Sequence, residues 1–183
     1  ATDLLPNNNI LNIISKASNK LYKRTVIELF KTDKPVPFKY DNKKINFLYM
    51  NGVIVPAPGE GEKHYIKFSC PFVQKRLFNY FSDEIFPGMY MLVPPEDDLA
   101  DAIDEKKLDI GNILKRYKNY LEQNHDWLLK KAPRRNDSRV FEAVFHFNLY
   151  KYLSEFLNPM DAWVYPEFPT GNGKVDLVIH YRE

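Results

Sequence analysis

The sequence predicts an α+β fold in two parts. Apolar residues recur at helical spacing over long stretches, such as 9–31 and 110–129. Short runs of β-branched and aromatic residues occur in two pairs, each interrupted by a turn that contains glycine. A proline-punctuated, acidic segment over 93–109 lies between the two parts. We therefore expect domains at 1–92 and 110–183, joined by an acidic linker over 93–109.

The first part begins with helical segments. Apolar residues over 9–31 fall into two sets, and Ser18 and Asn19 between them are typical of a helix end and a helix cap. Asn42 is of the kind that caps a helix, and the pair Asn51-Gly52 is typical of a helix end. We therefore expect two helices within 9–31 and a third, shorter helix after Asn42.

A β-hairpin is expected after these helices. Residues 53–55 and 64–68 have the composition of strands, and residues 56–62 between them form a loop rich in proline and glycine. One amphipathic helix over 72–86 follows. Three helices followed by a hairpin is the order of elements in a winged helix, so the sequence predicts a winged helix-turn-helix for residues 1–92.

The second part alternates long helices with short strands. Apolar spacing indicates two helices, and Asp137 or Ser138 could cap the second of them. Two apolar runs near the C-terminus have the composition of strands. The expected elements are helices at 110–129 and 139–157 and strands at 163–165 and 174–181.

Composition excludes several classes of protein. The single cysteine, Cys70, permits neither a disulfide framework nor a zinc site built on cysteines, and it is typical of a reducing compartment. No apolar run approaches the roughly 20 residues that span a bilayer. The N-terminus lacks the basic and apolar regions of a signal peptide. We expect a cytoplasmic protein with no membrane partner.

Asp176 is the residue with the clearest chemical implication. It lies in an apolar strand pattern between Val175 and Leu177, where a carboxylate costs free energy unless it is paired or binds a cation. Mg²⁺ prefers oxygen ligands, and both Glu142 and Glu167 precede Asp176, on the expected helix and strand. We predict Asp176 as a metal ligand, with Glu142 and Glu167 as further catalytic residues.

Structural roles remain open for the same carboxylates. Asp176 could instead pair with Lys174 or cap the preceding turn. Glu142 could be a solvated helix residue, and Glu167 could form a salt bridge in a loop. His146 shares a helix face with Glu142, but its phenylalanine neighbours favour a core histidine over a metal ligand.

Three motifs of the second part carry a family resemblance. They are Phe141-Glu142-Ala143-Val144-Phe145-His146, then Tyr165-Pro166-Glu167, then Thr170-Gly171-Asn172-Gly173-Lys174-Val175-Asp176-Leu177-Val178-Ile179. In this order they resemble the N-terminal half of a PD-(D/E)XK nuclease core, over residues 138–182. The similar proteins are nuclease-like domains fused behind AAA-ATPase-like modules. Those proteins place a winged helix between the ATPase and the nuclease, and residues 1–86 hold that position here.

The resemblance implies a Mg²⁺-dependent DNA endonuclease, with DNA and an ATPase domain of the same polypeptide as partners. In that family the next strand carries a Glu-x-Lys or Asp-x-Lys element, which supplies a second metal-binding carboxylate and a lysine that positions or activates water. The sequence reaches Glu183 before such an element. We therefore expect a truncated or degenerate domain that requires completion before it binds Mg²⁺ and cleaves DNA. No Gly-x-x-x-x-Gly-Lys-Ser/Thr motif occurs in the chain.

Two basic clusters could contact nucleic-acid phosphates. Residues 16–44 contain nine lysines and arginines against three acids, and residues 113–139 contain eight against three. Such an excess favours binding to a phosphate backbone. The candidate DNA-binding residues are Lys39, Lys43, Lys44, Lys130, Lys131, Arg134, Arg135 and Arg139.

Two alternatives to an enzyme remain open. Winged helices attached to ATPases often act as lids or docking surfaces, and Glu60 and Glu62 make the wing unfavourable for DNA. The chain could therefore be a non-catalytic DNA- or protein-binding module that regulates an ATPase. A plain transcription regulator would instead bind DNA sequence-specifically through residues 1–92 alone.

Overall fold

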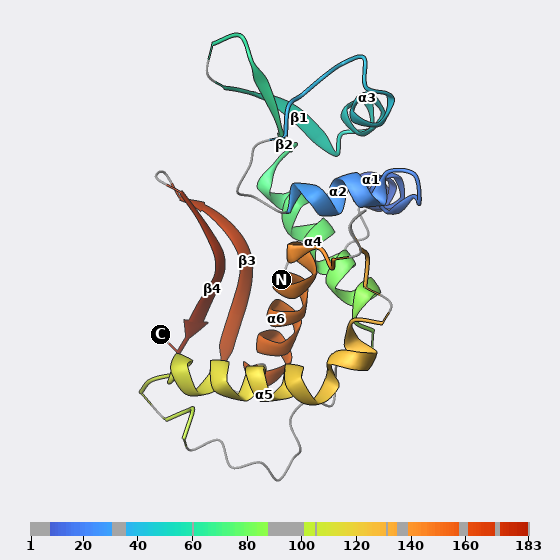
Figure 1. Cartoon of the computed structure of the whole chain (residues 1–183). Helices are drawn as coiled ribbons and strands as arrows, with labels where there is room; N and C mark the ends of the chain where they lie inside the picture. Colours follow the sequence, from blue (N-terminus) through green and yellow to red (C-terminus); the bar gives the residue numbers. More distant parts are fainter. Residues whose placement is uncertain are drawn as a thin grey trace. The chain divides into compact units, whose positions relative to one another are not determined.

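The computed structural model of the chain contains both helices and antiparallel strands (Figure 1). It describes residues 8–30, 36–59, 61–87, 101–104, 106–130, 132–134, 139–157, 161–170 and 173–182, with the backbone alone at 167–170 and 173–176. The mixed content confirms the predicted α+β class. The elements are α1 (Asn8–Ser18), α2 (Lys23–Leu29), α3 (Lys43–Met50), β1 (Ile54–Pro58), β2 (His64–Phe68), α4 (Pro71–Ile85), α5 (Ile110–Leu128), α6 (Glu142–Leu157), β3 (Ala162–Thr170) and β4 (Gly173–Tyr181).

The chain divides into two compact units. The first unit comprises residues 1–80 and 141–143, and the second comprises residues 81–140 and 144–183. None of the helices that the structure describes combines the length and the apolarity that a bilayer crossing requires.

The predicted break between the first two helices is confirmed. Helix α1 ends at Ser18, and the backbone carbonyl of Asn19 then accepts hydrogen bonds from the amides of Tyr22 and Lys23 at 2.9 and 2.8 Å. The Asn19 side chain accepts a further bond from the Leu21 amide at 3.0 Å. An asparagine side chain that bonds to the backbone two residues on stabilises a turn, so this residue ends one helix and leads into the next.

Helix α3 has the cap that the sequence predicts. The Asn42 side chain accepts hydrogen bonds from the amides of Lys44 and Ile45 at 3.0 and 3.3 Å. The helix ends before Gly52, whose φ of +69° is readily adopted only by glycine. Both ends of this helix therefore follow from local chemistry.

Replacing Asn42 with alanine should lower the free energy of unfolding by about 1 kcal/mol, because two helix amides lose their acceptor. Urea unfolding followed by circular dichroism measures the change. Asn46→Ala is the matched control, since Asn46 is exposed within the same helix and alanine has the higher helix propensity. An equal loss in both variants would contradict the capping role.

The first hairpin is longer than predicted. Strand β1 runs from Ile54 to Pro58 and pairs antiparallel with β2, so the expected loop over 56–62 begins too early. Proline cannot donate to a ladder, so within sheets it occurs in edge strands, at the start of a strand or at bulges. Strand β1 pairs only with β2 among the described residues, which explains how Pro56 and Pro58 fit within it. On the other side of β2, the Phe38 amide donates to the His64 carbonyl at 2.8 Å.

Aromatic side chains fill the core of the first unit. Phe30 has no exposed surface, and its ring centroid lies 4.6 Å from that of Phe68 and 5.5 Å from that of Phe78. Leu48 from α3 and Leu77 from α4 are also fully buried. The apolar periodicity of the sequence therefore corresponds to a common core.

The segment before α5 is folded where the structure describes it. Asp109 caps α5 by accepting a hydrogen bond from the Asn112 amide at 3.0 Å. Ile103 and Leu108 form a β-bridge. The Asp101 carboxylate lies 2.6 Å from the Arg116 guanidinium, and this hydrogen bond lowers the pKa of Asp101. Several acids of the expected linker thus have defined structural partners.

Helix α6 begins later than predicted. The expected start was residue 139, whereas the helix begins at Glu142. Val140 forms a β-bridge with Arg134, and this extended pairing keeps the backbone out of the helix until the next turn. The predicted caps, Asp137 and Ser138, lie outside the described residues.

A buried polar cluster joins α5 to α6 within the second unit. The Tyr117 hydroxyl donates to the Asn148 side chain at 2.9 Å, and Tyr152 packs against both Tyr117 and Tyr120. Burial, together with the neighbouring Tyr152, raises the pKa of Tyr120 to about 12. Burial raises the pKa of Tyr117 as well. These hydroxyls are therefore neutral structural groups.

Lys151 is a buried cation with two acidic partners. It is 8% exposed, and its Nζ lies 2.6 Å from Oδ1 of Asp83 and 3.5 Å from Oε1 of Glu155. A buried charge is tolerated only when it is paired. Asp83 and Glu155 therefore stabilise the ammonium group on α6.

Candidate functional site

Two residues of the predicted site, Glu167 and Asp176, lie on the β3–β4 hairpin. The two strands are antiparallel, and Trp163 pairs with His180, while Pro166 pairs with Leu177. Both strands are longer than the predicted 163–165 and 174–181. Successive residues of a strand point to opposite faces of a sheet, so the register divides the hairpin into two faces.

The two faces of the hairpin differ in burial. Ala162 is 7% exposed, and Pro166 is also buried. Tyr181, which pairs with Ala162, donates its hydroxyl to the Asp104 carbonyl at 2.6 Å. Trp163, at a position of the opposite face, is 56% exposed. Buried side chains thus occur on the Ala162 face and exposed ones, Trp163 and His180, on the other face, while the remaining described side chains of both faces are half-buried.

Two of the three predicted catalytic residues lie at one level of this hairpin. Pro166 pairs with Leu177 and Phe168 pairs with Val175 across the two strands. The positions of Glu167 and Asp176 lie between these pairs and therefore oppose each other. Alternation assigns both positions to the same face as Trp163. Their side chains lie outside the described residues. The backbone thus brings together two acidic positions that are nine residues apart in sequence.

Glu142 has a different setting. It is the first residue of α6, its side chain is exposed, and by its contacts it belongs to the first unit, whereas the hairpin belongs to the second. His146, one helical turn later, is half-buried, and its Nδ1 has no hydrogen-bond partner among the described residues.

No ready metal cluster is present among the described side chains. Within that part of the chain, no three histidine, cysteine, aspartate or glutamate residues form a group that could hold a metal ion. The side chains of Glu167 and Asp176 are not among those described.

Most of the predicted DNA-binding residues are exposed where the structure describes them. Lys39, Lys43 and Lys44 are exposed at and before the start of α3. Tyr40, which is 63% exposed, lies among them and contacts the ring of Phe38 edge-on at 4.8 Å. The surface at the start of α3 thus combines cations with an accessible ring.

The second basic cluster is only partly described. Lys130, Arg134 and Arg139 are exposed, and Arg134 donates to the Leu129 carbonyl at 3.3 Å, next to the end of α5. Lys131 and Arg135 lie outside the described residues. Part of this cluster therefore satisfies backbone groups near a helix C-terminus, where cations are favourable.

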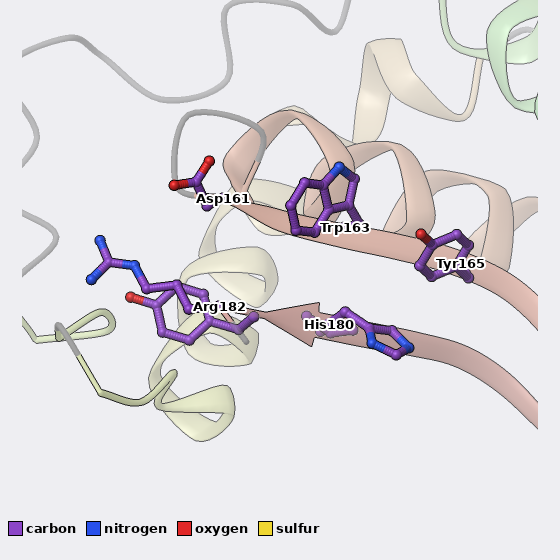
Figure 2. Close-up of a pocket in the computed structure, with 7 residues that line it drawn as sticks. Asp161, Trp163, Tyr165, His180 and Arg182 are labelled. Carbon is purple, nitrogen blue, oxygen red and sulfur yellow. The ribbon is translucent and has the colours of Figure 1, made fainter. Parts of the chain in front are cut away.

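A pocket that the sequence did not predict lies at the end of the hairpin (Figure 2). Its volume is about 830 Å³. The alternation of Trp163 and Tyr165 with the small or apolar Ala162, Val164 and Pro166 was the available sequence signal. The lining residues are Asp161, Trp163, Tyr165, Ile179, His180, Tyr181 and Arg182.

Comparison with known proteins identifies no relative. No protein-family model, no curated protein and no solved structure matches the chain.

Proposed function

We propose that this chain contains a winged helix and the first half of a PD-(D/E)XK-type nuclease core, whose complete form hydrolyses DNA phosphodiesters with Mg²⁺. The observation that supports the proposal most is that the register places the positions of Glu167 and Asp176 opposite each other on the two strands of the hairpin. Like charges directly opposite each other in an antiparallel pair are destabilising. A cation bound by both carboxylates would offset this repulsion.

The donor chemistry fits Mg²⁺. This ion takes oxygen ligands and keeps several waters, so one or two carboxylates are enough to bind it next to a substrate phosphate. Asp176 and Glu167 would hold the ion. Bound Mg²⁺ would supply Lewis-acid polarisation of the phosphate and a more acidic water. The supporting role that the sequence predicts for Glu142 stays a prediction, because Glu142 belongs to the first unit and the hairpin to the second.

The first unit supports a DNA-facing role for its winged helix. Helices α1, α2 and α3 are followed directly by the β1–β2 hairpin, which is the order of elements in a winged helix. Exposed Lys39, Lys43 and Lys44 at and before the start of α3 could contact phosphates. An ATPase domain of the same polypeptide is the second proposed partner.

The test is cleavage of supercoiled plasmid by the natural full-length protein. We expect nicking that requires Mg²⁺ and stops with EDTA. Asp176→Asn should lower the rate on the order of 100-fold or more, because metal catalysis supplies several kcal/mol of transition-state stabilisation. Asp126→Asn is the matched control, since the Asp126 side chain is 91% exposed on α5. Unchanged cleavage by Asp176→Asn would refute the site.

A non-catalytic binding module is the second candidate function. The exposed lysines and Tyr40 at the start of α3 favour it, because this surface needs no metal. In the plasmid experiment it predicts a mobility shift of the DNA without cleavage, equal in the wild type and in Asp176→Asn.

A further inference from the structure

The outer edge of β4 has no strand partner among the described residues. Strand β4 is nine residues long and pairs only with β3 in that part of the chain. An open edge of this length presents backbone donors and acceptors that can pair with another strand. A hairpin of two strands is at best marginally stable, and a further strand adds pairing and apolar contacts. The hairpin therefore has a place for another strand.

The two edges of the hairpin differ in their ability to accept a strand. Strand β3 contains Pro166 and Pro169, which are three positions apart, so their backbone nitrogens face opposite sides of the strand. One of the two prolines therefore removes a donor from the outer edge of β3. Strand β4 contains no proline. The outer edge of β4 therefore keeps all of its donors, and it is the edge that fits another strand.

A second copy of β4 fits this edge. In an antiparallel pair, residues that oppose each other share a face of the sheet. When two β4 strands meet across a two-fold axis at Val178, Leu177 opposes the partner's Ile179, and Val175 opposes the partner's Tyr181. These apolar positions alternate along β4 and share one face. The pairing therefore continues one apolar face across both copies of the hairpin.

The charged positions of β4 select this register. With the axis at Val178, the position of Asp176 opposes the partner's His180. An acid opposite a basic group stabilises an antiparallel pair, whereas like charges directly opposite destabilise it. An axis at Leu177 would place Lys174 opposite the partner's His180, and an axis at Asp176 would place the two aspartates opposite each other. Axes nearer either end of β4 would pair fewer residues. Charge complementarity therefore favours the axis at Val178.

His180 has the exposure that a ligand from a partner needs. Its side chain is exposed, and neither ring nitrogen has a hydrogen bond to a described residue. Its ring contacts that of Tyr165 edge-on, with centroids 5.5 Å apart. His180 pairs with Trp163, so it lies on the same face as the positions of Glu167 and Asp176. The imidazole is therefore accessible on the face that carries the two acidic positions.

The two-fold pairing brings three metal donors into one row. Neighbouring strands are about 4.8 Å apart, so Glu167, Asp176 and the partner's His180 occupy adjacent strands opposite one another. The two carboxylates supply oxygen donors, and the imidazole supplies a nitrogen donor. Imidazole suits transition metals better than Mg²⁺. This donor set therefore fits a divalent transition metal such as Mn²⁺.

We propose that two copies of this chain pair through their β4 strands across a two-fold axis at Val178, and that the partner's His180 completes the metal site of Glu167 and Asp176. The proposal rests on the proposed function in taking these two acids as metal ligands. It adds a third ligand and the copy that supplies it. Because a two-fold interface is self-complementary, one dimer has two such sites.

The first test is the oligomeric state of the natural full-length protein, measured by sedimentation velocity in EDTA. We expect a dimer. Val178→Lys should dissociate it, because two like charges then oppose each other at the axis. Val164→Lys is the matched control, since Val164 is also half-buried but lies on β3, and this variant should remain a dimer. A monomeric wild type, a dimeric Val178→Lys, or dissociation of both variants would overturn the proposal.

The second test is the affinity for Mn²⁺, measured by isothermal titration calorimetry. His180→Ala should weaken binding roughly 10-fold or more, because even residues that only orient metal ligands account for about 10- to 100-fold. Co-expression of His180→Ala with Asp176→Asn should restore wild-type affinity at about a quarter of the sites, because one site of each mixed dimer then keeps every ligand. Co-expression of Glu167→Gln with Asp176→Asn is the matched control. It should restore no site, because both acids of a site come from one copy.

The outcomes separate this proposal from the proposed nuclease. Mn²⁺ binding that mixed dimers restore, in a protein that never cleaves DNA, would retain the shared site and remove the nuclease. Cleavage that depends on Asp176 in a monomer would do the reverse. Full Mn²⁺ affinity in His180→Ala, or no recovery in its mixed dimers with Asp176→Asn, would overturn the role of the partner's His180.

Discussion

Phe30→Ala should lower the free energy of unfolding by about 3–5 kcal/mol. Phe30 is completely buried in the first unit, between the rings of Phe68 and Phe78. Truncation removes the apolar contacts of a whole ring and leaves a cavity that the neighbouring rings fill only in part. Since domains are stable by about 5–15 kcal/mol, this single change should remove a large share of the total.

Urea unfolding followed by far-ultraviolet circular dichroism measures this loss. Phe72→Ala is the control, because Phe72 is 49% exposed on α4 and exposed substitutions usually change stability by less than about 0.5 kcal/mol. Equal unfolding midpoints for Phe30→Ala and the wild type would mean that the three rings do not form a packed core.

Lys151→Glu should be comparably destabilising near neutral pH, by about 3–5 kcal/mol. Position 151 is 8% exposed, and the new carboxylate would lie near Asp83 and Glu155. Burial and two like charges both disfavour its ionised form, so the pKa of the new group rises in the folded protein. A raised pKa in the folded state means that the penalty is smallest at low pH and grows as pH rises.

The pH dependence distinguishes this mechanism from simple misfit. Lys151→Glu should lose less stability relative to wild type at about pH 5 than at about pH 8. Lys151→Met retains the apolar stem without the charge, so its smaller loss should be independent of pH over this range. Urea midpoints of the three proteins at both pH values measure the difference. A penalty that stays constant with pH would contradict the burial of this carboxylate.

Helix boundaries that depend on local chemistry could be predicted from the sequence. The Asn42 cap, the left-handed Gly52 and the break at Asn19 each involve neighbours within a few residues. These cap and turn interactions involve residues close in sequence, so they depend little on the tertiary fold. Composition therefore located these ends correctly.

Boundaries that depend on distant partners could not be predicted in this way. Pro56 and Pro58 indicate a loop, yet both belong to β1 because that strand has a partner on one side only among the described residues. Val140 fits a helix pattern, but its bridge to Arg134 delays α6. In each case pairing across the fold outweighs local propensity.

The metal site at Asp176 stays a prediction. Asp176 was predicted as a metal ligand because a carboxylate conflicts with its apolar neighbours in the sequence, and the backbone register places position 176 on the opposite side of the strand from positions 175 and 177. The same register places the position of Glu167 opposite that of Asp176 on the neighbouring strand. The exposure of Trp163 was not predicted, because an aromatic residue in a strand pattern is equally typical of a buried core position.

The division into two units has a practical consequence for spectroscopy. Both tryptophans, Trp127 and Trp163, belong to the second unit, whereas the first unit contains none. Intrinsic indole emission therefore reports on the second unit alone, while the far-ultraviolet signal averages the helices of both. If the two units unfold together, the two signals have the same midpoint of denaturation. The difference between the two midpoints therefore measures how cooperatively the two units unfold.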